Sequence, residues 1–190
     1  DVYCTQGESS TAEFLKLEKK YRYFKVYETG WCKVDSYFKV QAEKNISSEK
    51  PTIIYSSTFT KDISSAPQLI YVIKKLAQQR LWNWIITLHP KINDVELIEE
   101  YRNLARENTN VTFNDGPVDI QLLRKADVML CDSSSIIVEF MLLDKPVVTF
   151  RNTNPGDYLL NVLNEEELEG ALEEALSRPE HLMEHIHNYT

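Results

Sequence analysis

From residue 51 onward, short β-branched and aliphatic runs alternate with segments of helical periodicity. Runs such as IIYS and VVTF are apolar throughout, which is typical of strands buried on both faces of a sheet. The segment 66–80 instead repeats apolar residues at helical spacing, as a helix packed on one side does. Because strands that alternate with helices are joined by right-handed crossovers, the pattern predicts an α/β domain with a doubly wound parallel sheet.

The same periodicities place the individual elements of this domain. We predict strands over 52–57, 84–88, 111–113, 128–131 and 147–150. The predicted helices are 66–80, 94–107, 118–125, 135–143, 165–177 and 179–187. The residues between 150 and 165 are interpreted as a loop.

A shorter part of the chain precedes this domain. Residues 1–5 and 23–27 are strand-like and 11–20 are helix-like, whereas 36–50 loses periodicity and ends in polar residues, as a linker does. We therefore predict two domains, 1–45 (the end of a preceding half plus a linker) and 46–190. The first residue is Asp1 rather than methionine and begins inside a predicted strand, so we expect a fragment of a longer protein.

Composition excludes several classes of function. A net charge of −8 offers no basic surface for nucleic acid. No apolar run has the length of a membrane span, and no glycine-rich phosphate loop of the GxGxxG or GxxxxGK[ST] type occurs. The three cysteines have no CxxC spacing, and His181, His185 and His187 have no further ligand cluster beside them. We expect no metal and no cofactor, and a reducing, cytoplasmic setting.

The strongest candidate site follows the strand predicted over 128–131. Asp132, Ser133, Ser134 and Ser135 come directly after it and open the next predicted helix. A helix N-terminus offers unpaired backbone N–H groups and the positive end of the helix dipole, which together favour phosphate. Ser and Asp also cap helices when no ligand is bound, so ordinary capping is the alternative interpretation.

Polar residues at the other strand ends extend this candidate site. His89 leaves an apolar strand directly into a proline, where its imidazole can donate to a phosphate oxygen. Glu139 is a carboxylate among apolar neighbours, one turn into the helix, where it can accept sugar hydroxyls. Thr58 follows the first strand of the domain, and Arg151 and Asn152 follow the fifth. No catalytic residue can be assigned from these patterns.

Four short motifs occur in a fixed order along the chain: IIYSSTFT over 53–60, His89-Pro90, ADVMLCDSSSIIVEF over 126–140, and Lys145-Pro146. This order resembles the C-terminal, nucleotide-binding half of the CDP-glycerol glycerophosphotransferases, GT-B-fold enzymes that build teichoic-acid-type polymers in cell wall biogenesis. In that family the similar motifs are ILYAPTFR, then His-Pro, then ADVLITDYSSVIFDY, which precedes a strand that begins with Lys-Pro. The TGWCKVD segment over 29–35 likewise resembles the family's TGxPRxD turn.

The resemblance implies a donor site and a reaction. His89, Ser134 and Ser135 would hold the pyrophosphate of CDP-glycerol, Ser133 stands where the family has tyrosine or serine, and Glu139 would lie near the ribose. The domain would serve transfer of glycerol phosphate to a polymer or glycolipid acceptor. The other half would supply the acceptor site, and the full protein would be cytoplasmic, with peripheral association at the inner face of the membrane. This chain by itself would be inactive.

The chain departs from the family's motifs, and two alternatives remain open. Thr60 stands where the family usually has a basic residue, although Lys61 follows, and Cys32-Lys33 replaces the Pro-Arg of the turn. The sequence also resembles the UDP-N-acetylglucosamine 2-epimerases, another GT-B family, whose DSGGxxEE motif aligns with Asp132, Ser133 and Glu139. That resemblance implies a UDP-sugar ligand, and the same alternative includes other GT-B glycosyltransferase domains. The remaining alternative is a non-catalytic interaction domain that keeps the fold.

Overall fold

A computed structural model describes residues 1–35 and 49–190. The chain divides into two compact units, Asp1–Glu43 and Lys44–Thr190, and each is described by itself. The linker expected over 36–50 lies almost entirely outside the described residues, and so does the expected boundary at residue 45.

The first unit is a strand–helix–strand element. Strands β1 (Val2–Thr5) and β2 (Lys25–Glu28) pair in parallel and are joined by helix α1 (Glu8–Tyr21). The helix begins three residues earlier than periodicity predicts, because the extended Gly7 serves as its N-cap. A short 3-10 turn, η1 (Cys32–Val34), follows β2.

Within the described residues, the second unit contains a six-stranded sheet in which every pairing is parallel. Its strand order is β5-β4-β3-β6-β7-β8, so the chain first builds outward from β3 on one side and then returns to build on the other. The strands are β3 (Thr52–Ser57), β4 (Asn83–Leu88), β5 (Val111–Phe113), β6 (Val128–Cys131), β7 (Val147–Phe150) and β8 (Leu160–Val162). This is the doubly wound parallel architecture that the alternation of elements predicts.

The prediction of a loop between residues 150 and 165 is wrong in part, because strand β8 lies within it. This strand has three residues, and its central one is the polar Asn161, so it lacks the apolar run that marks the other strands. Pairing with β7, through Val148 and Leu160, makes it a strand. Its Asn161 carboxamide oxygen accepts hydrogen bonds from the Thr149 hydroxyl and the Asn152 backbone N–H, so this strand fixes the loop that leaves β7.

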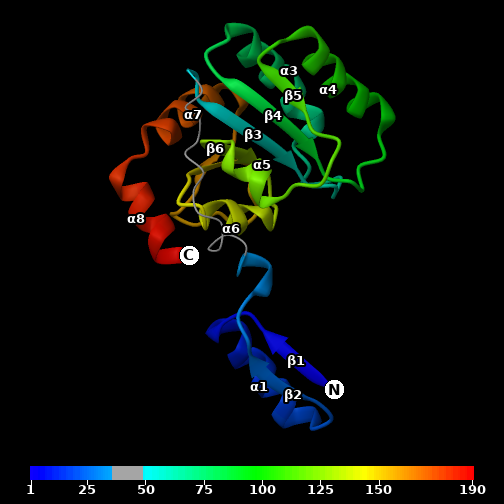
Figure 1. The fold of residues 1–190 in the computed structure, drawn as a ribbon, viewed down its shortest axis with the longest axis vertical. Coiled ribbons are helices and arrows are strands. Elements are labelled where there is room, and N and C mark those ends of the chain that lie inside the picture. The colour runs from blue at the N-terminus through cyan, green and yellow to red at the C-terminus, as the bar shows by residue number, and fades with distance from the viewer. Residues whose placement is uncertain (36–48) are drawn as a thin grey trace. The chain divides into compact units, whose positions relative to one another are not determined.

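Helices cover both faces of the sheet (Figure 1). The core on one face joins α3 (Ala66–Gln79), α4 (Val95–Glu107) and α7 (Leu168–Ser177) to β3, β4, β6 and β7. Helices α5 (Ile120–Arg124) and α6 (Ile136–Met141) cover the opposite face, as their position across the strands in Figure 1 shows. The 3-10 turn η2 (Glu165–Glu167) leads into α7, and α8 (Glu180–Tyr189) ends the chain.

Lys145 of the Lys-Pro motif has a structural role. Its ammonium donates to the carbonyl oxygens of Leu123, Arg124 and Ala126, and thereby satisfies acceptors at the C-terminal end of α5. Burial lowers the pKa of Lys145 to about 8, since the partly buried site disfavours the charged form. Helix α6 ends just before this motif, at a turn where Asp144 has a left-handed φ of 56°.

Candidate functional site

The site lies at the carboxyl edge of the sheet, between β3 and β6. The chain order reverses at this point, and in open parallel sheets the loops on either side of such a reversal diverge and leave room for a ligand. Residues that follow β3, β4, β6 and β7 meet here, because all these strands point the same way. The structure therefore brings together Thr58, His89, the Asp132–Ser135 segment and Asn152 at one edge.

A buried carboxylate organises this edge. Asp132 is fully buried, and one of its oxygens accepts from the Ser57 hydroxyl at 3.1 Å and from the Ser65 backbone N–H at 2.9 Å. The backbone N–H of Thr58 donates to both carboxylate oxygens, at 2.9 and 3.1 Å. Asp132 thus holds the loop after β3 and the start of α3 to the end of β6. Its role in this structure is positioning, since its oxygens face protein donors.

The network around Asp132 continues into the core through neutral hydroxyls. The hydroxyl of Ser65 donates to Asp132 at 3.0 Å and lies 2.8 Å from the hydroxyl of Tyr55. Burial raises the pKa of Tyr55 well above its ordinary value, so the phenol stays protonated. Tyr55 stacks on Tyr101 of α4 at 5.8 Å between ring centroids. The floor of the site is therefore continuous with the core between β3 and α4.

Ser133 ties the β6 loop to the β7 loop. Its hydroxyl accepts from the Thr153 backbone N–H at 2.9 Å and lies 3.1 Å from the Thr153 hydroxyl. Asn152 makes the reciprocal contact, because its side-chain amide donates to the Asp132 carbonyl oxygen at 3.2 Å. Both residues, predicted as ligand contacts, are engaged with the protein in this structure.

Ser134 and Ser135 differ from Ser133. Ser135 is the N-cap of α6, yet its hydroxyl makes no capping bond, so the capping interpretation does not describe it. In the described part of the chain neither hydroxyl has a hydrogen-bond partner. Both line a pocket of about 350 Å³, between the start of α6, the loop after β7 and the end of α8. The other lining residues are Ser133, Ile137, Val138, Asn152, Asn154, Tyr158, Leu159 and Tyr189.

His89 is held in one tautomer at the end of β4. Its Nδ1 accepts from the Lys91 backbone N–H at 3.1 Å, and its own backbone N–H donates to the Ser57 carbonyl oxygen at 3.2 Å. A neutral imidazole whose Nδ1 accepts carries its proton on Nε2. The ring is half-buried and lies 4.5 Å from the Phe59 ring, between centroids. His89 can therefore offer an Nε2–H donor to an anion at this edge.

The remaining candidates occupy different settings. Glu139, on α6, is buried with 7% exposure, and Thr58 is buried with 8%. Arg151 has a left-handed φ of 51°, and its guanidinium donates to the Leu163 carbonyl oxygen and to Gln68 of α3. Arg151 therefore connects the loop after β7 to α3 and to the residue that follows β8. Nothing in the sequence signalled Asn161, Tyr158 or Tyr189, because their places depend on the unpredicted β8 and on packing of α8.

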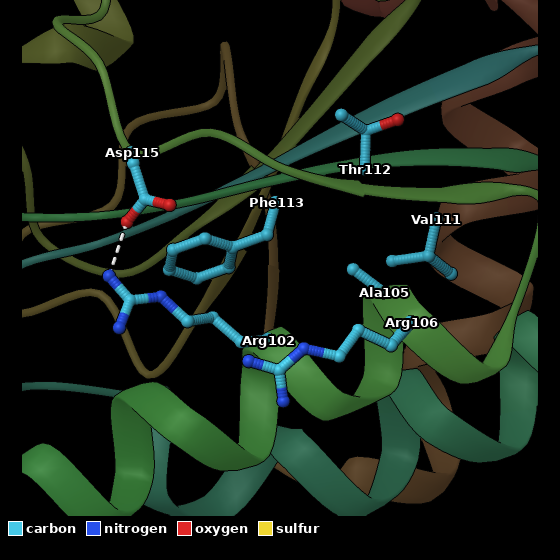
Figure 2. Close-up of a pocket in the computed structure, with 7 residues that line it drawn as sticks. All are labelled: Arg102, Ala105, Arg106, Val111, Thr112, Phe113 and Asp115. Atoms are coloured by element: carbon cyan, nitrogen blue, oxygen red, sulfur yellow. Dashed lines mark hydrogen bonds and ion pairs between the residues drawn. The ribbon is translucent and has the colours of Figure 1, made fainter.

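A larger pocket, of about 530 Å³, lies beside the edge strand β5 and holds none of the predicted ligand contacts (Figure 2). Its two arginines already have acidic partners: Arg102 pairs with Asp115 at 2.6 Å, and Arg106 with Glu99 at 2.7 Å. Figure 2 shows the Arg102 guanidinium beside the Phe113 ring as well, with 5.6 Å to the ring centroid. This pocket is an open groove between α4 and β5, away from the switch point.

Among the described residues, no three His, Cys, Asp or Glu side chains are grouped so as to hold a metal ion. His185 instead binds Asp157, through a 3.1 Å contact of Nδ1 with the carbonyl oxygen. No helix in the described ranges is both long enough and apolar enough to cross a bilayer.

A parallel doubly wound sheet, with hydroxyls and an imidazole at the carboxyl ends of its strands, defines a Rossmann-like domain. The chain belongs to the family described as CDP-glycerol:poly(glycerophosphate) glycerophosphotransferases, which matches residues 2–156. It is 25% identical over 155 residues to the teichoic acid glycerol-phosphate primase of Bacillus subtilis (strain 168), a match that covers 78% of this chain and 39% of the primase. The chain therefore spans well under half of the curated relative that it matches.

Solved structures share the fold at low identity. The S. aureus MnaA–UDP complex has a TM-score of 0.63 and 17% identity, over 96% of this chain and 53% of that one. Anabaena Alr3699/HepE in complex with UDP-glucose has a TM-score of 0.58 and 17% identity, over 95% of this chain and 55% of that one. These similarities confirm the predicted GT-B fold class, and the family match confirms the resemblance inferred from the four motifs.

Proposed function

We propose that the second unit binds the nucleotide donor of a glycerophosphotransferase and that the donor is CDP-glycerol. Family membership and the similarity to a glycerol-phosphate primase support this proposal. The observation that carries it is the pair of serines, Ser134 and Ser135, which follow β6 beside the switch point, line the pocket between α6, the loop after β7 and the end of α8, and lack side-chain hydrogen bonds within the described residues. Hydroxyls and backbone N–H groups of this kind are donors suited to phosphate oxygens.

The proposed diphosphate lies between these serines and His89. Strand β3 alone separates β4 from β6, so the two sides of the site are two strand spacings apart, roughly 10 Å between backbones. In this proposal the diphosphate spans that distance, with the His89 imidazole on one side and the hydroxyls of Ser134 and Ser135 on the other. Glu139, one turn into α6, would accept the ribose hydroxyls. The domain carries a net negative charge, so the phosphates must be bound by such local donors.

The chemistry proposed for the full protein is attack by an acceptor hydroxyl on the β-phosphorus of CDP-glycerol. A new O–P bond forms, the bond between the β-phosphorus and the bridging oxygen breaks, CMP leaves, and a base takes the hydroxyl proton. Positioning and charge neutralisation dominate catalysis of phosphoryl transfer. We propose that residues 1–45 end a preceding half that supplies the base and the acceptor site, so this chain binds donor without turnover. All three cysteines are free, in keeping with the proposed cytoplasmic setting.

Calorimetry with CDP, UDP and CMP tests the proposal. We expect CDP to bind most tightly, and Ser134→Ala/Ser135→Ala to abolish that binding without lowering the unfolding midpoint. Ser177→Ala, at the exposed end of α7, is the matched control and should bind as the parent does. Tighter binding of UDP would favour a UDP-sugar ligand of the epimerase type. Binding of none of the three would favour a non-catalytic interaction domain, and binding that survives the double substitution would move the site elsewhere.

A further inference from the structure

Three side chains from two neighbouring loops form a cluster beside the proposed donor site. Phe59 follows β3, and the segment from His89 to Lys91 follows β4. The Phe59 ring lies 4.5 Å from the His89 ring, between centroids, and the Lys91 ammonium lies 4.8 Å from the Phe59 centroid. The aromatic ring therefore contacts an imidazole and an ammonium at the same time.

The two loops are anchored, so this cluster has a fixed base. The residue before Phe59 is Thr58, whose backbone N–H is bound by the buried Asp132 carboxylate. The backbone N–H of Lys91 donates to His89 Nδ1, which sets both the turn of the chain and the imidazole tautomer. The flexible part of Lys91 is its side chain, and contact with the face of Phe59 restricts it.

Lys91 carries a charge that no acidic side chain neutralises within the described ranges. An ammonium on an aromatic face remains able to donate hydrogen bonds, because the ring quadrupole attracts the charge without consuming a donor. Phe59 is 44% exposed, so solvent and ligands have access to this cluster. The cluster thus offers an incoming anion an Nε2–H donor and a cation on one side of the sheet edge.

We propose that Lys91 is a second contact to the donor diphosphate, held by Phe59 beside His89. This inference rests on the proposed function and adds to it the source of positive charge. The other lysine in these two loops is Lys61, which follows β3. Lys61 is exposed on the turn that begins at Thr60, with no ring contact comparable to that of Lys91. The positive charge therefore comes from Lys91, and Phe59 is its positioning residue.

The test compares Lys91→Met with Lys61→Met, two substitutions that each remove one lysine charge from the same edge. Titration with CDP, CMP and inorganic pyrophosphate measures affinity. We expect Lys91→Met to lower the affinity for CDP and for pyrophosphate about tenfold. The affinity for CMP should fall less than threefold, because the proposed contact is to the second phosphate, which CMP lacks. Lys61→Met should leave all three affinities within twofold of the parent. Lys91→Arg should restore most of the CDP affinity.

The outcomes separate this inference from the proposed function. Parental affinity for CDP in Lys91→Met overturns the role of Lys91 while leaving the donor site in place. Equal losses in Lys91→Met and Lys61→Met show general electrostatics and also overturn it. Failure of the parent to bind CDP overturns the proposed function itself. Phe59→Leu adds a second measure: loss of CDP affinity, with Lys91 intact and an unchanged unfolding midpoint, supports the positioning role.

Discussion

The Oδ2 atom of Asp132 lies 2.9 Å from the backbone nitrogen of Ser65, although 67 positions separate the two residues in the chain. This bond joins the end of β6 to the N-cap of α3, and the same oxygen accepts from the Ser65 hydroxyl. A carboxylate that receives donors from both the backbone and side chains of a neighbouring loop fixes that loop in place. The candidate site therefore has a floor that hydrogen bonds within the protein hold in place.

The first prediction concerns that floor. Asp132→Asn should destabilise the fold by about 2–4 kcal/mol, because the amide turns an N–H₂ group toward buried donors and leaves them unsatisfied. Urea unfolding of the variant measures this loss. Asp115→Asn is the control, since Asp115 is exposed, and it should change the unfolding free energy by less than about 1 kcal/mol. An unchanged midpoint in Asp132→Asn would show that the network does not stabilise the fold.

The second prediction separates Ser133 from its two neighbours. Ser133→Ala removes the bonds to Thr153 and should lower the unfolding free energy by about 0.5–1.5 kcal/mol. Diphosphate affinity should fall less than in Ser134→Ala or Ser135→Ala, whose hydroxyls stabilise nothing in the unliganded fold. Parallel unfolding and calorimetry on the three single variants measure both effects. The opposite pattern, with binding most sensitive at Ser133, would reverse the assignment of roles.

The third prediction is a pH dependence. Lys145 has a pKa of about 8 in the folded chain, below its ordinary 10.5, because burial disfavours the ammonium. Between these values the unfolded chain binds more protons than the folded one, so this group makes stability rise with pH. The Lys145→Met variant has no ammonium to titrate at this position. The difference in unfolding free energy between the parent and the variant should therefore grow, in favour of the parent, from pH 8 to pH 10. Urea midpoints of both proteins across that range measure it, and a constant difference would contradict the lowered pKa.

Much of this fold could be predicted because the buried strands are apolar along their whole length. Strands β3, β5, β6 and β7 were predicted with the bounds that the structure has, whereas β8 was missed because pairing rather than composition makes it a strand. The residues at the switch point could also be predicted, since parallel strands must end at one edge. The different roles of these residues could not be predicted. Whether a hydroxyl faces Thr153 or an open pocket, and where the Lys91 ammonium lies, depends on side-chain packing that periodicity does not encode.

The last prediction concerns the wall of the pocket opposite the serines. The Tyr158 ring packs directly over Gly156, and a Cβ at that position would lie 2.2 Å from its Cε1 atom. Tyr158 also stacks on Tyr189 of α8 at 3.8 Å between centroids, and its hydrogen bond with Tyr189 raises its pKa to about 12. Gly156→Ala must therefore displace the ring from its partner.

Displacement of Tyr158 has consequences that can be measured separately. In Gly156→Ala we expect the pKa of Tyr158 to fall toward its ordinary value of 10.0, which an ultraviolet titration of phenolate detects. Stability should fall by about 1–3 kcal/mol because the new methyl group overpacks the site. Gly170→Ala, in the open on α7, is the matched control and should stabilise the fold by up to about 1 kcal/mol. A Tyr158 titration unchanged in Gly156→Ala would show that this glycine does not set the pocket wall.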